Sequence, residues 1–293
     1  MNKKYNLRFF KILFRQLTVT FMVLFFLPTL LFAARATCSK TGNYITRLGN
    51  GTINWSTGRI SAKGTASPLK EDKSKTSSSI PGAAKTDAIV NLISILKNIK
   101  ISKESVKEFV ASNDNIMAQI ENTMSDVSAV DQHYTSDGAL EIKIATSMYG
   151  SFLQSVLPHD ISRIPEIKSI ETSGKIQQQR GKYTGLVLDA RGLGFKPLLY
   201  PLVMNEQGDE VYSALFINRE YAVQYGVCKY FCSMEKAAAN KRVGNNPLIL
   251  KGLRAGEGGK SIILNKPDAE KIERIIERHS FFKECRVIIV LDQ

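Results

Sequence analysis

The chain has 293 residues, with 40 Lys and Arg residues against 27 acidic residues and a formal net charge of +13. Six of the basic residues and none of the acidic ones lie in residues 1–36, so the excess over the remaining chain falls to about +7. This modest excess, without a dense basic stripe interleaved with aromatic residues, argues against a nucleic-acid-binding protein. It is compatible with a mildly basic solvated surface, or with an anionic polymer or lipid as partner.

Residues 1–36 have the layout of an export signal. The segment opens with basic residues and no acidic ones: Lys3, Lys4, Arg8, Lys11 and Arg15. An apolar run from Leu17 to Ala34 follows, and small residues stand at Ala34 and Ala36. The competing interpretation is a retained inner-membrane anchor, because the run is near the lower length limit for crossing a bilayer. Both place the rest of the chain outside the cytoplasm, in the periplasm or at the outer membrane.

The chain has four cysteines, which an oxidising compartment favours as disulfides. Cys228 and Cys232 would share one face if their segment were helical, which predicts a local disulfide between them. The alternatives are two free, buried thiols, or a bridge from either residue to Cys285. Cys38 follows the apolar run closely and is a candidate for lipid attachment. Lipidation normally demands a small residue directly before the cysteine and an apolar residue three before it, and Thr37 and Arg35 occupy these places. We expect no metal site, because the histidines are scattered and no C-x-x-C pair exists.

The first elements after the signal alternate between strands and helices. Residues 43–64 predict a β-hairpin with Ile53, Trp55 and Ile60 pointing inward, and residues 70–79 predict a surface loop. Residues 83–97 then have helical spacing of apolar residues.

A second helical stretch is predicted after an N-cap at Ser102, with a break at residues 112–114. Residues 127–148 predict another hairpin, folded at Asp137-Gly138. The order of strand pair, helices and strand pair favours an antiparallel sheet with helices on one face.

The second half follows a proline-containing stretch at residues 158–179, which we interpret as a linker. Predicted strands cover residues 183–189, 195–204, 211–217, 261–264 and 285–291, and predicted helices cover residues 219–230, 234–241 and 267–279. The last strand is too apolar for a half-exposed position and should lie centrally in a sheet. The chain is therefore predicted as an α+β protein of two domains, each a mostly antiparallel sheet with helices packed on one face: 1–36 signal or anchor, 43–157 first domain, 158–179 linker, 180–293 second domain.

No arrangement of residues predicts catalysis or a cofactor. Residues 189–194 place two glycines after a strand, and we interpret them as a connection in which Asp189 and Arg191 pair or cap the turn. Residues 259–261 resemble the end of a phosphate-binding loop, but the required glycine is replaced by Arg254. Carboxylate pairs lie at turns and are interpreted as solvated: Asp131 with Asp137, and Glu206 with Asp209. An enzyme would need a pocket where residues 189–194 meet distant parts of the chain.

Three motifs resemble the LPP-twenty-like lipoprotein family and the related middle domain of flagellar assembly protein T. They are the hairpin INWSTGRISAKGTA with Trp55, Gly58, Ile60, Ala62 and Gly64, the helix AAKTDAIVNLISILKNIKIS with Ala84 and Ala88, and the stretch SDGALEIKIATSMYGSF with Asp137, Gly138, Glu141, Ile142 and Gly150. The resemblance covers about residues 43–155. The second half looks like a region found beside this domain in exported bacterial proteins. The resemblance implies an envelope location and an α/β domain, and it implies no catalysis.

The sequence therefore predicts an exported, non-enzymatic scaffold or assembly factor of the bacterial cell envelope, with an appendage such as the flagellum as one setting. The alternative is a binding module for an anionic envelope polymer or lipid surface. The expected partners are envelope proteins or the membrane surface, without nucleic acid and without a cofactor.

Overall fold

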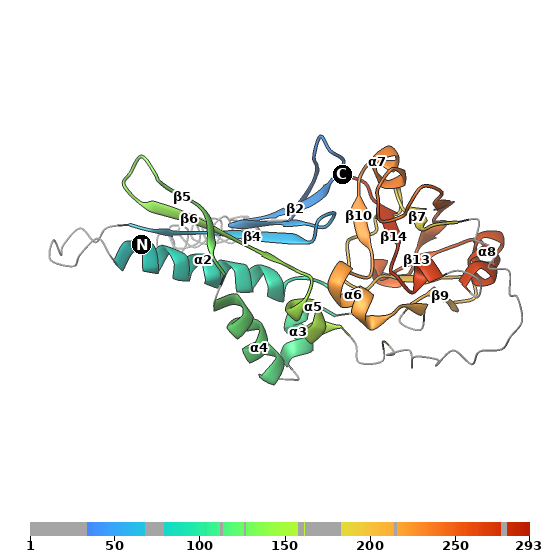
Figure 1. Ribbon diagram of the computed structural model, residues 1–293, viewed down its shortest axis with the longest axis horizontal. Coiled ribbons are helices and arrows are strands. Elements are labelled where there is room, and N and C mark those ends of the chain that lie inside the picture. Colours follow the sequence, from blue (N-terminus) through green and yellow to red (C-terminus); the bar gives the residue numbers. More distant parts are fainter. Residues whose placement is uncertain are drawn as a thin grey trace, which may run out of the picture. The chain divides into compact units, whose positions relative to one another are not determined.

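The computed structural model describes residues 34–67, 79–102, 104–111, 114–125, 127–157, 161, 183–213, 216–276 and 280–293. Its N-terminal half is built on a six-stranded sheet in which every neighbouring pair is antiparallel (Figure 1). The strands, in spatial order, are β1 (Arg35–Cys38), β2 (Tyr44–Leu48), β3 (Gly51–Asn54), β4 (Arg59–Ala66), β6 (Leu140–Ser147) and β5 (Ala129–Tyr134). The predicted inward residues are confirmed, since Ile53, Trp55 and Ile60 are buried. The turn at Gly138, which has a φ of 83°, joins β5 to β6 as predicted.

Helix α2 (Ser79–Lys97) packs along one face of this sheet, mainly on β4 and β6. Its buried side includes Ala84, Ala88 and Leu92, each 0% exposed. The helix begins four residues before the predicted start, and Pro81 lies in its first turn, where a missing backbone N–H costs no helical hydrogen bond. Residues 70–78 of the predicted loop lie outside the described residues. Its last residue, Ser79, is the first residue of α2.

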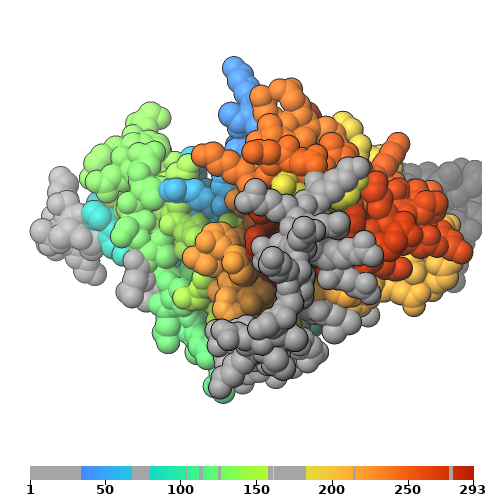
Figure 2. Space-filling model, turned by 45° about the vertical axis from the view of Figure 1, so that its right-hand side comes forward, coloured from blue at the N-terminus to red at the C-terminus, as the bar shows by residue number. Residues whose placement is uncertain are grey.

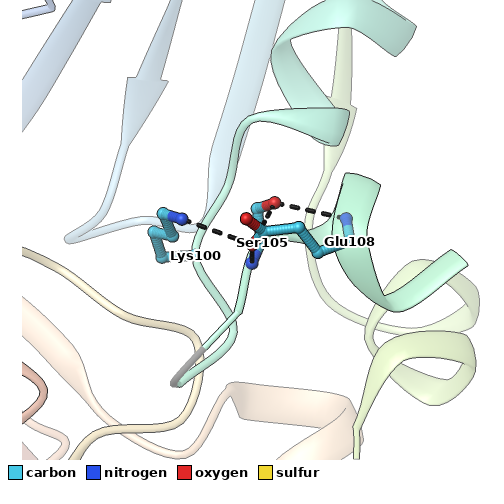
Figure 3. Close-up of polar contacts among 3 residues, drawn as sticks. All are labelled: Lys100, Ser105 and Glu108. Carbon is cyan, nitrogen blue, oxygen red and sulfur yellow. Dashed lines mark hydrogen bonds and ion pairs between the residues drawn. The ribbon is translucent and has the colours of Figure 1, made fainter. Parts of the chain in front are cut away.

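Helices α3 (Val106–Ala111), α4 (Asp114–Ser125) and α5 (Ser151–Val156) complete the N-terminal half. Helix α3 ends at Ala111 and α4 begins at Asp114, so of the predicted break at residues 112–114 the last residue is helical and the first two lie outside the described residues. The N-cap of α3 is Ser105 and not Ser102. Figure 3 shows the reason. The backbone N–H of Ser105 donates to Glu108 Oε2 at 2.6 Å, and the N–H of Glu108 donates to Ser105 Oγ at 3.3 Å. This reciprocal capping box satisfies two backbone donors that the helix itself leaves unpaired.

The capping box should make stability depend on pH. The N–H and hydroxyl of Ser105, followed by the charge of Lys100, lower the pKa of Glu108 from 4.5 to about 2. A carboxylate whose pKa falls on folding stabilises the protein fully above its unfolded pKa, and this contribution is lost as pH falls from about 4.5 towards 2. We expect Glu108→Gln to lower the free energy of unfolding at pH 7 and to differ progressively less from wild type below pH 4.5, measured by urea unfolding. Glu104→Gln, at an exposed neighbouring carboxylate, should show no such pH-dependent difference; an equal effect there would contradict the capping role.

The C-terminal half contains two further four-stranded sheets. One is parallel throughout, in the order β10 (Lys229–Phe231), β14 (Val287–Val290), β7 (Leu186–Asp189) and β11 (Leu248–Lys251). The other is mixed, in the order β12 (Arg254–Ala255), β13 (Ser261–Ile263), β8 (Leu202–Met204) and β9 (Glu210–Tyr212). The helices among the described residues of this half are α6 (Arg219–Tyr225), α7 (Met234–Ala238) and α8 (Lys266–Ile276), with 3-10 turns at Glu257–Gly259 and Ser280–Phe282.

The predicted fold class is confirmed only as a mixture of helices and sheets. A mostly antiparallel sheet is correct for the N-terminal half and wrong for the C-terminal half, where the central sheet is parallel. Parallel pairing joins strands far apart in sequence, so no local turn signal indicates it. The central position of the last strand is confirmed, because β14 lies between β10 and β7 and all four of its residues are buried.

Local predictions in this half need three corrections. The predicted helix at residues 219–230 ends at Tyr225, because Gly226 at its C-cap has a φ of 80° and β10 follows. Of the predicted strand at residues 195–204, only Leu202–Met204 forms a strand, which is β8. Strand β11 was not predicted. The predicted linker at residues 158–179 lies outside the described residues, except for Ile161.

The two halves contact each other through strands and loops. Asn43 forms a β-bridge with Phe231, and the N–H of Tyr200 donates to the carbonyl of Ile101 at 2.7 Å. In the space-filling view, blue atoms of the N-terminal strands border orange atoms of the segment that holds α6, β10 and α7 (Figure 2). One hydrophobic cluster of buried residues includes side chains from both halves. The halves therefore share a core.

Candidate functional site

The face of the six-stranded sheet opposite α2 carries polar side chains. Residues directly opposite each other on neighbouring strands share a face, as do residues two apart on one strand. The register places Arg35 opposite Arg47, and it places Asn54, Arg59 and Ser147 in one row across β3, β4 and β6. We call this surface the polar face, since its side chains are polar except at Ile45 and Ala145. It comprises Arg35, Thr37, Ile45, Arg47, Thr52, Asn54, Arg59, Ser61, Lys63, Thr65, Asp131, His133, Glu141, Lys143, Ala145 and Ser147.

Positive charge is only partly balanced on the polar face. Lys63 Nζ lies 2.7 Å from Glu141 Oε1, and Lys143 lies opposite Asp131 on β5. In contrast, Arg35 and Arg47 are exposed like charges directly opposite each other, an arrangement that destabilises a strand pair. Among the described residues, no acidic group forms an ion pair with Arg47 or Arg59.

A pocket opens on the polar face where the turn between β3 and β4 meets the end of β6. Its volume is about 540 Å³, within the usual range of small-molecule sites. It is lined by Asn54, Thr57, Gly58, Arg59, Ala145, Thr146 and Ser147. The lining combines one guanidinium with hydroxyl and amide groups.

Backbone contacts hold the wall of this pocket. Asn54 Oδ1 accepts hydrogen bonds from the N–H groups of Ser56 and Thr57, both at 3.1 Å, which orients the Asn54 side chain. The N–H of Met148 donates to the carbonyl of Gly58 at 2.7 Å and ties the turn to the end of β6. Gly58 has a φ of 76°, a conformation that favours glycine.

Tyr149 connects the pocket wall to the C-terminal half. A Cβ atom at Gly58 would overlap the Tyr149 ring, and a Cβ atom at Gly226 would lie 2.7 Å from the same ring, so the ring lies between the two glycines. Lys229 Nζ lies 6.0 Å from the ring centroid. Burial raises the pKa of Tyr149 to about 12 and lowers the pKa of Lys229. The pocket therefore adjoins a packed and largely dehydrated junction.

The chemistry of the pocket suits binding. Its seven lining residues include no carboxylate, histidine or cysteine, so they provide neither a general base nor an activated nucleophile. A guanidinium surrounded by neutral hydrogen-bonding groups is instead the arrangement that recognises an anion bearing hydroxyl groups.

The predicted disulfide between Cys228 and Cys232 is wrong. Cys232 forms a disulfide with Cys38, 194 residues away in sequence, with a Cα–Cα distance of 6.0 Å. Cys228 and Cys232 flank strand β10, and an extended chain separates residues four apart by roughly 13 Å, beyond the reach of a disulfide. The helical spacing assumed for the pair does not exist.

The disulfide also corrects the interpretation of Cys38 as a candidate for lipid attachment. A lipid thioether and a disulfide would use the same sulfur atom, so the oxidised Cys38 cannot carry a lipid. Cys38 lies at the end of β1. Its partner Cys232 also donates its backbone N–H to the carbonyl of Gly42 in the N-terminal half at 3.0 Å. The two halves are thus joined covalently beside their shared hydrogen bonds. A disulfide is typical of an oxidising compartment and consistent with export.

The other two cysteines are free and buried, at Cys228 and Cys285. Burial raises the pKa of each thiol to about 12. A protonated, buried thiol is a poor nucleophile, so these cysteines pack as small apolar residues.

The connection at residues 189–194 lies at the carboxyl end of β7 in the parallel sheet. Arg191 Nε and Nη2 donate to the two carboxylate oxygens of Asp189 at 2.8 and 2.7 Å, which confirms the predicted pairing. This hydrogen bonding lowers the pKa of Asp189 and raises that of Arg191. The N–H of Gly192 donates to Asp292, which follows β14. These charges pair with each other and stabilise the turn.

The remaining sequence candidates are structural. Residues 257–259 form a 3-10 turn, and a strand follows Lys260, so the helix that a phosphate-binding loop needs is absent at this point of the described chain. Asp131 lies on the polar face, far along the hairpin from Asp137 at the turn. Glu206 accepts a hydrogen bond from the N–H of Lys266 at 3.1 Å.

Two further features concern the described part of the chain. No group of three or more histidine, cysteine, aspartate or glutamate side chains there is arranged to hold a metal ion. No described helix is both long enough and apolar enough to cross a membrane.

Residues 185–293 match the family described as the second domain of Treponema pallidum Tp0624. The match covers a little over a third of the chain and contains all strands of the parallel and mixed sheets. No curated protein matches the chain. The Tp0624 match lies beyond residues 43–155, so the resemblance to the LPP-twenty-like family remains a prediction.

The sequence interpretation missed the residues of the pocket. Asn54, Arg59 and Ser147 lie on three strands, and only the strand register makes them neighbours. The available signal was the alternation along β4. Arg59, Ser61 and Lys63 lie on one face of the strand, and the buried apolar residues Ile60 and Ala62 lie on the other. That alternation identifies the face, but not the pocket.

Proposed function

We propose that this chain is an exported protein of the bacterial cell envelope that acts as a non-enzymatic scaffold or assembly factor, in the periplasm or at the outer membrane. The disulfide between the two halves supports an oxidising location. The resemblance of residues 43–155 to the LPP-twenty-like family supports the envelope and makes an appendage such as the flagellum one setting for the role. Other envelope proteins are the expected partners.

The observation that carries this proposal is the edge strand β5. All six of its residues are exposed, and among the described strands it pairs only with β6. Val130 is 48% exposed and Tyr134 is 69% exposed. An edge strand with unpaired backbone groups and exposed apolar side chains can add a strand from a partner chain, unless charge or proline blocks it.

The proposal can be tested by cross-linking in native cells. A photoreactive residue at position 134 should form a discrete cross-linked species in the envelope fraction, while one at Val90, 58% exposed on α2, should not. Introducing Val130→Lys with a cross-linker at position 134 should abolish the species, because edge lysines oppose strand addition. Equal cross-linking from both positions, or no effect of the lysine, would refute docking at β5.

A second candidate function is a binding module for an anionic envelope polymer or lipid surface. The specific observation in its favour is the set of exposed arginines on the polar face that no described acidic residue neutralises.

A further inference from the structure

We propose that the pocket on the polar face binds an acidic saccharide, with Arg59 as the residue that holds its anionic group. The inference deepens the second candidate function by naming its site and ligand class, and it does not depend on docking at β5. Four observations support it.

The first observation is the position of Arg59. Its neighbours in the row across the sheet are Asn54 and Ser147, so a guanidinium stands between an amide and a hydroxyl at the usual spacing of adjacent strands, about 5 Å. Asn54 Oδ1 is already used by two backbone N–H groups, which leaves the amide nitrogen as a donor toward the pocket. The guanidinium can bind a carboxylate through two parallel N–H groups.

The second observation is the shape and lining of the pocket. A concave space of about 540 Å³ has room for a small polar ligand. Besides Arg59, the polar side chains on this face are those of Asn54 and Ser147, with Thr57 in the adjoining turn, and such groups both donate and accept hydrogen bonds. Sugars present many hydroxyl groups that need such partners. A bilayer surface is flat and favours protruding large apolar side chains, and the pocket lining contains none.

The third observation is the charge elsewhere on the polar face. Arg35 and Arg47 face each other across β1 and β2, on the same face as Arg59. Opposed like charges cost stability in the free protein, and a bound anion would relieve that cost. Several cations along one face suit a ligand with repeated charges, such as a chain of acidic sugars.

The fourth observation is the rigidity of the wall. Gly58 is held by the N–H of Met148 and covered by the Tyr149 ring, and the disulfide joins this half to the other. A site on rigid elements loses less conformational entropy on binding.

The test uses the disulfide-intact, exported form of the chain and its single tryptophan, Trp55, which lies in the turn beside the pocket. An oligomer of galacturonic acid is titrated while Trp55 fluorescence is recorded, with the neutral galactose oligomer as control. We expect a saturable change with the acidic oligomer only. Arg59→Gln should weaken binding by roughly tenfold or more, since it removes a charge-assisted, paired hydrogen bond. The affinity of Arg59→Lys for the acidic oligomer should fall between those of wild type and Arg59→Gln, because lysine keeps the charge but cannot form the paired hydrogen bond.

The matched control is Arg254→Gln, because Arg254 is also an exposed arginine on a strand, but in the other half. It should bind within about twofold of wild type, since it only lowers net charge at a distance. Thermal unfolding of each variant checks that the fold is retained.

Three outcomes would overturn the proposal: equal binding by Arg59→Gln, an equal loss in Arg254→Gln, or equal binding of the neutral oligomer. Phosphatidylglycerol vesicles form a separate arm. Binding to vesicles that depends on Arg59, without binding of the acidic oligomer, would assign the site to lipid and reject the saccharide. Cross-linking from β5 is unaffected by these variants, so failure here is distinguishable from failure of the scaffold role.

Discussion

Replacing Cys38 with serine is expected to lower the midpoint of thermal unfolding by on the order of 10 °C. The disulfide to Cys232 spans 194 residues, so its loss frees a very long loop in the unfolded chain. The chain-entropy relation for such a loop gives a stabilisation of about 5 kcal/mol. Calorimetry of wild type and the variant under non-reducing conditions measures the difference.

Two controls make this prediction specific. Reductant should lower the midpoint of wild type to that of Cys38→Ser and leave the variant unchanged. Cys228→Ala removes a free, buried thiol and should retain the response to reductant. Peptide mapping without reductant should recover Cys38 linked to Cys232, and a linked pair of Cys228 and Cys232 would contradict the structure.

Replacing Gly64 with alanine is expected to destabilise the N-terminal half by about 3 kcal/mol or more. A Cβ atom at Gly64 would overlap backbone atoms of Ala84 and Ala88 on α2. Helix backbone cannot move aside as a flexible side chain can, so α2 would have to lift away from β4. Its buried leucine and isoleucine side chains, Leu92 among them, would lose contacts with the sheet.

The matched control is Gly49→Ala, in the turn before β3. Nothing lies within 4 Å of a Cβ atom at Gly49, so this substitution should change the free energy of unfolding by no more than about 0.5 kcal/mol. Urea unfolding of both variants provides the comparison. Similar values for the two positions would show that α2 does not pack closely on β4 at Gly64.

The same contact explains two of the motifs that carry the family resemblance. Gly64 closes the hairpin motif, and Ala84 and Ala88 form the helix motif; the three residues meet where α2 crosses β4. Gly58, in the hairpin motif, allows the Tyr149 ring to pack on the turn. These small residues are therefore accounted for by close packing of backbone, which is a structural role.

Much of the N-terminal half could be predicted from the sequence. The alternation around Ile53 and Ile60, the turn at Gly138 and the apolar spacing of α2 are local patterns, and each is buried or folded as predicted. Strand and helix periods are short, so a few residues suffice to show which side is apolar. The central position of β14 was predicted for a similar reason, from its continuous apolar run.

The sequence by itself determined these local elements and the apolar face of each. Only the tertiary structure decided the parallel order of the C-terminal strands, the partner of Cys232, and the row of Asn54, Arg59 and Ser147 that forms the pocket. All three depend on contacts between segments far apart in the chain. Such contacts are set by the summed packing of whole elements, and no short stretch of residues records which distant segment will lie beside it.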